Sequence, residues 1–155
     1  MLAVLALALA AAGCGGSAGG GPEQAVARAD TPDAMLKRVL AEHFQGHYRL
    51  AYDSLHPSHQ ALVTRENYAY CVGRVLRTIE LGPVRTVDVV DAPLHRDGIP
   101  QTTAKQVTLK ITAVQGDMRD SWEQSFRAVR VGGRWAWILP DTDVDDYRAG
   151  RCPPA

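Results

Sequence analysis

The pattern of hydrophobic and polar residues changes its period about halfway along the chain. Between residues 31 and 75, apolar residues recur three or four positions apart, which is the spacing of one face of an α-helix. From residue 84 to residue 139, apolar and polar residues alternate, which is the spacing of a half-buried β-strand. Helices followed by a run of strands predict an α+β domain, with N-terminal helices packed on an antiparallel sheet.

Capping residues indicate where the predicted helices begin. Thr31-Pro32-Asp33 combines a hydroxyl N-cap, a proline at the first helical position and an acid in the first turn, and predicts a helix start. After Gly46 we expect a short helix over 48–55 and a brief one over 56–62. Thr64 caps a further helix. Its apolar face carries Tyr68, Cys71, Val72 and Val75.

The second half predicts a curved antiparallel sheet of about four strands. The alternating segments are residues 84–90, 107–113, 122–131 and 135–139. Gly116-Asp117 and Gly132-Gly133 are hairpin turn sequences. Within the third strand, Val129 and Val131 fall on the opposite parity from Phe126 and Ala128, which predicts a bulge or a strong twist there.

The N-terminus carries a pattern typical of export. The unbroken apolar run over 1–12 is shorter than the roughly 20 residues that span a bilayer, and it has the length of a signal-peptide hydrophobic region. It ends in Ala11-Ala12-Gly13-Cys14, which resembles the lipobox of bacterial lipoproteins. The family more often has leucine where this chain has Ala11. The alternative is a buried helix that ends in a cysteine, which the glycines on both sides of Cys14 oppose.

The lipobox resemblance implies a layout in three parts. Residues 1–13 would be a signal peptide, and Cys14 would carry acyl chains such as palmitate. Residues 14–29 would form a flexible glycine-rich tether, and residues 30–155 the folded α+β domain. The expected location is therefore the cell membrane, with the domain lipid-anchored on the extracytoplasmic side.

A second resemblance concerns the domain itself. The segment AYDSLHPSHQALVTRENYAYC, the strands after it and the segment GGRWAWILP are similar to small nuclear-transport-factor-2-like domains of exported actinobacterial lipoproteins. The similarity spans about residues 31–152. It implies a cone, in which a curved antiparallel sheet wraps around helices. Such cones serve as ketosteroid isomerases, polyketide cyclases, dehydratases and non-catalytic binding modules, so the fold does not select among these functions.

The three cysteines predict one disulfide. If Cys14 is lipidated, Cys71 and Cys152 remain as a pair in an oxidising compartment. A bridge between them would close a loop of roughly 80 residues and contribute about 4 kcal/mol in the chain-entropy model. The alternative is two buried thiols.

Charge and histidine spacing argue against several classes of partner. The 17 basic and 17 acidic residues balance, so no basic surface for nucleic acid is expected. His43 and His47, and likewise His56 and His59, have the spacing of a helical pair but lack the third ligand that zinc requires. The acidic run over 141–146 lacks the glycine and terminal glutamate of a calcium loop, and we expect a solvated turn. We predict no metal and no cofactor.

The candidate pocket residues are aromatic. They are Tyr48, Tyr52 and Tyr68 on the helices and Trp122 and Trp135 on the strands. The inward strand positions contain no carboxylate, so we predict no catalytic residue.

The expected function is therefore non-catalytic binding, and its partner is an envelope protein, a cell-wall component or a small apolar ligand. The alternative is a pocket enzyme of the isomerase or cyclase type acting on a small apolar substrate. An open cavity that contains a carboxylate with a shifted pKa would favour the enzyme. A filled interior would favour an interaction surface.

Overall fold

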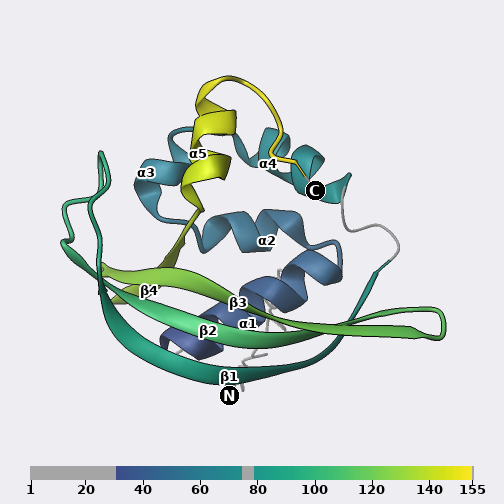
Figure 1. Ribbon diagram of the computed structural model, residues 1–155. Coiled ribbons are helices and arrows are strands. Elements are labelled where there is room, and N and C mark those ends of the chain that lie inside the picture. The colour runs from purple at the N-terminus through teal and green to yellow at the C-terminus, as the bar shows by residue number, and fades with distance from the viewer. Residues whose placement is uncertain (1–30, 75–78, 155) are drawn as a thin grey trace, which may run out of the picture.

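The computed structural model describes residues 31–74 and 79–154. It contains helices and a four-stranded antiparallel sheet in the order β1-β2-β3-β4, which confirms the α+β prediction (Figure 1). The sheet curves, and the helices lie on its concave side. The predicted signal peptide, Cys14 and the tether lie outside the described residues, which begin at Thr31.

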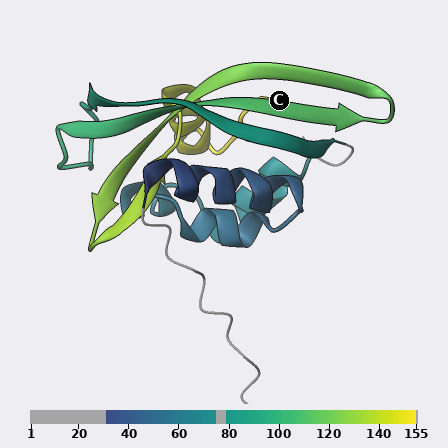
Figure 2. The same cartoon turned by 90° about the horizontal axis from the view of Figure 1, so that it is seen from below.

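The described residues of the first half fold into four helices. Two begin at the predicted caps: the hydroxyl of Thr31 accepts a hydrogen bond from the Ala34 amide at 3.4 Å, and that of Thr64 accepts one from the Asn67 amide at 3.2 Å. Each bond satisfies an amide that has no partner within its helix. Figure 2 shows this group of helices along one side of the sheet. The helices are α1 (Pro32–Phe44), α2 (Tyr48–Asp53), α3 (Pro57–Gln60) and α4 (Arg65–Gly73).

The second half forms the strands, and three of them are longer than the alternation predicted. The strands are β1 (Glu80–Pro93), β2 (Thr103–Gln115), β3 (Met118–Val131) and β4 (Arg134–Ile138). Both predicted hairpin turns are present, and Gly116, Gly132 and Gly133 have positive φ angles of 59°, 56° and 79°. Residues with a Cβ rarely adopt these angles, so glycine is the residue that such turns favour.

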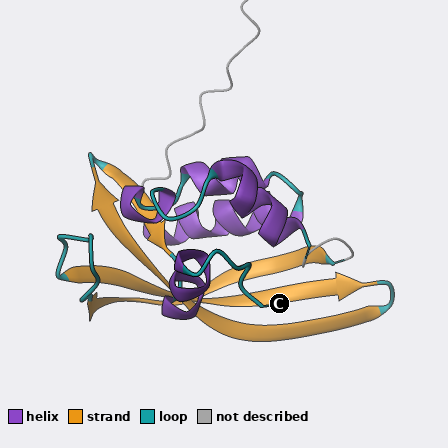
Figure 3. Ribbon diagram, turned by 90° about the horizontal axis from the view of Figure 1, so that it is seen from above, coloured by secondary structure: helices purple, strands orange, loops and turns teal. Residues whose placement is uncertain are grey.

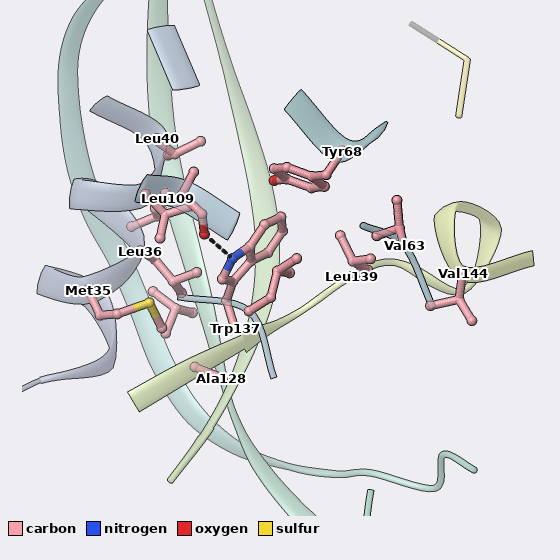
Figure 4. Packing of buried hydrophobic residues seen from close by; sticks show 14 of the residues in the cluster. Met35, Leu36, Leu40, Val63, Tyr68, Leu109, Ala128, Trp137, Leu139 and Val144 are labelled. Carbon is pink, nitrogen blue, oxygen red and sulfur yellow. Dashed lines mark hydrogen bonds between the residues drawn. The ribbon is translucent and has the colours of Figure 1, made fainter. Parts of the chain in front are cut away.

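The main core lies between the concave sheet face and the helices. Val107, Leu109 and Ile111 alternate along β2 and are each at most 1% exposed, as the period-two pattern predicted. Trp137 on β4 lies at the centre of this core, and its indole nitrogen donates to the Ala51 carbonyl at 3.3 Å (Figure 4). Because this bond satisfies the one polar atom of the ring, the indole can be buried at little cost.

The change of parity in the third strand marks a second core. The pairing of β3 with β4 runs through Val129 and Val131 without a register shift, and the pairing of β3 with β2 ends at Ala128, so the predicted bulge is not at this place. Ala128 faces the main core, whereas Val129 packs on the other sheet face against Leu94 and Ile99 of the β1–β2 connection. Both faces are therefore buried there, and apolar residues follow one another directly.

A fifth helix corrects the prediction for the acidic run. Residues 141–146 were expected to form a solvated turn, but they are the first part of helix α5 (Asp141–Arg148). Val144 and Tyr147 are 7% and 8% exposed and anchor this helix on the core. Figure 3 shows α5 over the strands, with the C-terminal residues running on from it. Acids in a first turn face the positive end of the helix dipole, which favours a helix here.

A disulfide joins Cys71 of α4 to Cys152 beyond α5, with a Cα–Cα distance of 5.2 Å. The pairing predicted from the sequence is therefore present. The bond connects segments 81 residues apart and holds the C-terminal residues against α4 (Figure 1). In the described part of the chain, no helix is long and apolar enough to cross a membrane.

Candidate functional site

A cavity of about 310 Å³ lies between the concave sheet face and the helical layer. Helices α1, α4 and α5, strands β2, β3 and β4, and the C-terminal residues all contribute to its wall. Most of the lining is apolar, and it includes Leu36, Val39, Leu40, Phe44, Val72, Ile111, Phe126 and Leu139. Mostly apolar concave sites with a few polar groups are typical of small-molecule binding.

The most buried polar pair in the cavity wall is His43 and Tyr68. The Nε2 atom of His43, in the last turn of α1, lies 2.6 Å from the hydroxyl oxygen of Tyr68, near the start of α4. Tyr68 is 1% exposed. Burial lowers the pKa of His43 to about 4 and raises the pKa of Tyr68 well above its usual value of 10.0. At neutral pH both groups are therefore uncharged, and one of them donates the hydrogen bond that joins them.

Helix α5 adds an acidic and a second phenolic group to the same wall. Burial, more than any other effect, raises the pKa of Asp143, and the neighbouring Asp146 raises it further. Burial also raises the pKa of Tyr147 to about 12. The Tyr147 ring lies 6.3 Å from the Tyr68 ring, centre to centre. Asp143 is the carboxylate among the residues that line this cavity.

Exposure distinguishes the inner end of the cavity from its mouth. The inner residues are Tyr68 and Trp137, which are 1% and 6% exposed. In contrast, Trp122 is 37% exposed, and Pro154 is exposed. The cavity therefore opens between β3 and the C-terminal residues, and a ligand that enters there reaches the His43–Tyr68 pair at the far end.

The chemical character of the site follows from these groups. The aliphatic lining favours apolar atoms by about 25 cal/mol per Å² buried. The His43–Tyr68 pair offers hydrogen bonding without a charge, and Asp143 offers a carboxylate with a raised affinity for protons. The arrangement suits an apolar molecule with one hydrogen-bonding group, and it contains a residue type that can act as a general base.

The predicted aromatic residues do not gather at one place. Tyr68 and Trp122 line the cavity described above. Tyr48 lines a separate recess beside α2, and Trp135 lines a third between α1 and the β3–β4 hairpin. The hydroxyl of Tyr52 instead donates to the backbone. Its oxygen lies 2.9 Å from the Gln60 carbonyl oxygen and 3.1 Å from the Val63 carbonyl oxygen.

Sequence reasoning missed three polar residues of the cavity. His43 follows Val39 at i+4 on the apolar side of α1, so its position in the helical pattern indicated that it faces inward. Asp143 and Tyr147 are also four residues apart, which is one turn of a helix. Helical spacing therefore indicated the inward position of His43 and placed Asp143 and Tyr147 on one face of a helix. The charge of the run over 141–146 instead suggested a solvated segment.

His56 and His59 have structural partners. The Nδ1 atom of His56 accepts from the Ser58 amide at 3.2 Å, and that of His59 accepts from the Leu139 amide at 3.1 Å. His59 thereby connects α3 to the end of β4. Over residues 31–74 and 79–154, no three His, Cys, Asp or Glu side chains converge as a metal site requires.

No protein-family model matches this chain, and no curated protein matches it either.

Proposed function

We propose that this chain is a membrane-anchored extracytoplasmic lipoprotein whose nuclear-transport-factor-2-like domain binds a small apolar ligand. The observation that carries the binding function is the cavity of about 310 Å³, with its apolar walls and the uncharged His43–Tyr68 pair at its inner end. The curved sheet with helices on its concave side supports the cone assignment. The lipobox-like sequence before Cys14 supports the anchor.

The apolar walls of the cavity and its few hydrogen-bonding groups determine which class of ligand it can bind. An apolar body gains from contact with the aliphatic and aromatic walls. A single hydroxyl or carbonyl group at one end of the ligand would exchange hydrogen bonds with Tyr68 or His43. A ligand with several charges would lose its hydration without compensating partners.

Binding is tested with a neutral fluorescent probe, N-phenyl-1-naphthylamine, on the full chain carrying Cys14→Ser, which has no acyl chains of its own. We expect saturable fluorescence enhancement from one site. Val72→Trp should abolish it, because Val72 lines the cavity and a tryptophan would fill the space. Tyr70→Trp on the same helix is the matched control, because Tyr70 is 65% exposed and outside the cavity.

Circular dichroism must show that both variants remain folded. Absence of saturable binding to the unsubstituted cavity would refute the proposal. Equal binding by the Val72→Trp and Tyr70→Trp variants would place the probe elsewhere on the chain.

An open cavity that contains a carboxylate with a shifted pKa is the feature expected of an enzyme, and it is present here, so an isomerase-type enzyme is the second candidate function. Binding of an apolar ligand stands first because both functions require it. The cavity wall contains Asp143, whose pKa is raised by burial, together with the hydroxyl of Tyr68. In an isomerase, such a carboxylate removes the proton between the carbonyl and the double bond of a β,γ-unsaturated ketone and returns it to the γ-carbon. A tyrosine hydroxyl donates a hydrogen bond to the enolate oxygen meanwhile.

This second function is tested with a β,γ-unsaturated ketone whose conjugated product absorbs in the ultraviolet. An enzyme should form the product, and Asp143→Asn should abolish turnover while probe binding is retained. Asp145→Asn is the control, because Asp145 lies outside this cavity on the same helix. Binding without turnover in the unsubstituted chain would leave the binding function alone.

A further inference from the structure

We propose that Pro153 and Pro154, held in place by the Cys71–Cys152 disulfide, form a wall that limits the length of the ligand. This inference rests on the proposed binding function, and it concerns which ligands the cavity accepts. Both prolines line the cavity, as do Cys71 and Val72 of α4.

The path of the chain brings these prolines to the cavity mouth. After α5 ends at Arg148, Gly150 turns the chain with a φ angle of 68°. The chain then returns to α4, where Cys152 bonds to Cys71 (Figure 1). Pro153 is half-buried and Pro154 is exposed, so they occupy the outer part of the cavity and not its inner end. A ligand seated at Tyr68 therefore meets the prolines as its length increases.

The disulfide is the covalent constraint on this wall. Before it, Arg151 is held to Asp146 by a bond from its amide to the carbonyl at 2.9 Å and by an ion pair at 2.7 Å. After it, neither Pro153 nor Pro154 has an N–H group, so neither can anchor the chain by donating a backbone hydrogen bond. Their position depends on the bond to Cys71 and on packing against the cavity rim.

A proline wall suits a size limit, because the ring locks φ and the segment does not adapt easily to a longer ligand. Each added methylene of a ligand should improve binding by roughly fourfold while it contacts the apolar wall. Once the ligand reaches the prolines, further methylenes must displace them or enter water. Affinity should then stop rising with length.

The experiment measures this limit with straight-chain primary alcohols of increasing length, which displace N-phenyl-1-naphthylamine from the full chain carrying Cys14→Ser. Two further variants remove the wall in different ways. A chain that ends at Cys152 keeps the disulfide and lacks the prolines, whereas Cys152→Ser keeps the prolines and lacks the disulfide. Arg151→Ala is the control, because it removes the ion pair to Asp146 but leaves the disulfide and both prolines in place, and Arg151 does not line the cavity.

Both wall variants should accept longer alcohols than the parent chain, and the probe should dissociate about tenfold faster from them. Arg151→Ala should keep the limit of the parent chain. An unchanged limit in the chain that ends at Cys152 would overturn the inference, even if Cys152→Ser changes it, because loss of the disulfide also loosens the fold. If neither the probe nor any alcohol binds the parent chain, the proposed function fails, and this inference fails with it.

Discussion

Two buried polar side chains in the cavity wall, His43 and Tyr68, are each other's hydrogen-bond partners. Two groups that are costly to bury alone thus satisfy each other at 2.6 Å inside an apolar cavity. The same pair limits where a ligand can make a hydrogen bond.

Tyr68→Phe tests how much this hydrogen bond contributes to the free energy of unfolding. Removal of the hydroxyl leaves the His43 ring without its buried partner, and we expect the free energy of unfolding to fall by about 1–2 kcal/mol. Tyr70→Phe on the same helix removes an exposed hydroxyl and should change it little, since Tyr70 is 65% exposed. Urea denaturation of both variants measures the difference, and equal losses would contradict the assigned role.

Acid should destabilise the fold through buried histidine. Burial lowers the pKa of His43 from 6.5 to about 4, so between these values the unfolded chain binds more protons than the folded protein. Stability therefore falls as the pH drops through this window, by about 2 kcal/mol from this residue between about pH 7.5 and about pH 4.5. His59, whose pKa burial also lowers to about 4, acts in the same direction.

His43→Gln should reduce this pH dependence without abolishing it, because His59 remains. His47→Gln is the control, since His47 is exposed. Urea denaturation of both variants at several pH values gives the slopes. An unchanged slope in His43→Gln would show that this ring is not held neutral by the fold.

At the scale of elements, helix α5 and the C-terminal residues complete a domain that the first four helices and the sheet leave open on one side. Asp143 and Tyr147 of α5 line the cavity, and the disulfide secures the residues after it to α4. This part of the chain therefore affects both stability and ligand access.

Cys152→Ser, compared in the full chain carrying Cys14→Ser, should lower the free energy of unfolding by about 2–4 kcal/mol. The physical reason is that the unfolded chain regains the freedom of a loop 81 residues long. For a domain of this size each kcal/mol corresponds to roughly 4 °C in the melting temperature. Calorimetry measures the shift. Thiol titration of the parent should find no free thiol, and two titratable thiols would contradict the disulfide.

At the scale of the whole molecule, the proposed anchor and the cavity have complementary roles. A tether of residues 14–29 would hold the domain near the membrane surface, where apolar small molecules are concentrated. The proposed attachment to the membrane is through acyl chains on Cys14.

In a bacterial host that processes lipoproteins, the chain should lose residues 1–13 and carry acyl chains on Cys14. Cys14→Ser should release the protein from the membrane fraction or leave the precursor unprocessed. Mass spectrometry and membrane fractionation measure both outcomes, with Cys71→Ser as the control that keeps Cys14. An intact Met1 with an unmodified Cys14 would refute the anchor.

The periodicity of the sequence determined the layered architecture, because local spacing alone decides which side of a helix or strand is apolar. It predicted the helix starts at Thr31 and Thr64, both hairpin turns and the buried side of β2. The choice of Cys71 and Cys152 as a pair came from counting cysteines after the lipobox. Each of these features depends on a few neighbouring residues or on composition.

Tertiary structure alone decided what the cavity contains. From the sequence of the strand alone, the change of apolar parity at Val129 predicts a bulge or a strong twist. In the structure, the β1–β2 connection covers the second sheet face, and Val129 is buried against it. Asp143 belongs to an acidic run that favours solvent, yet burial of Val144 and Tyr147 in the same helix places it in the cavity wall. His43 and Tyr68 meet across 25 residues. Contacts between distant segments depend on how whole elements pack, and no local pattern records that packing.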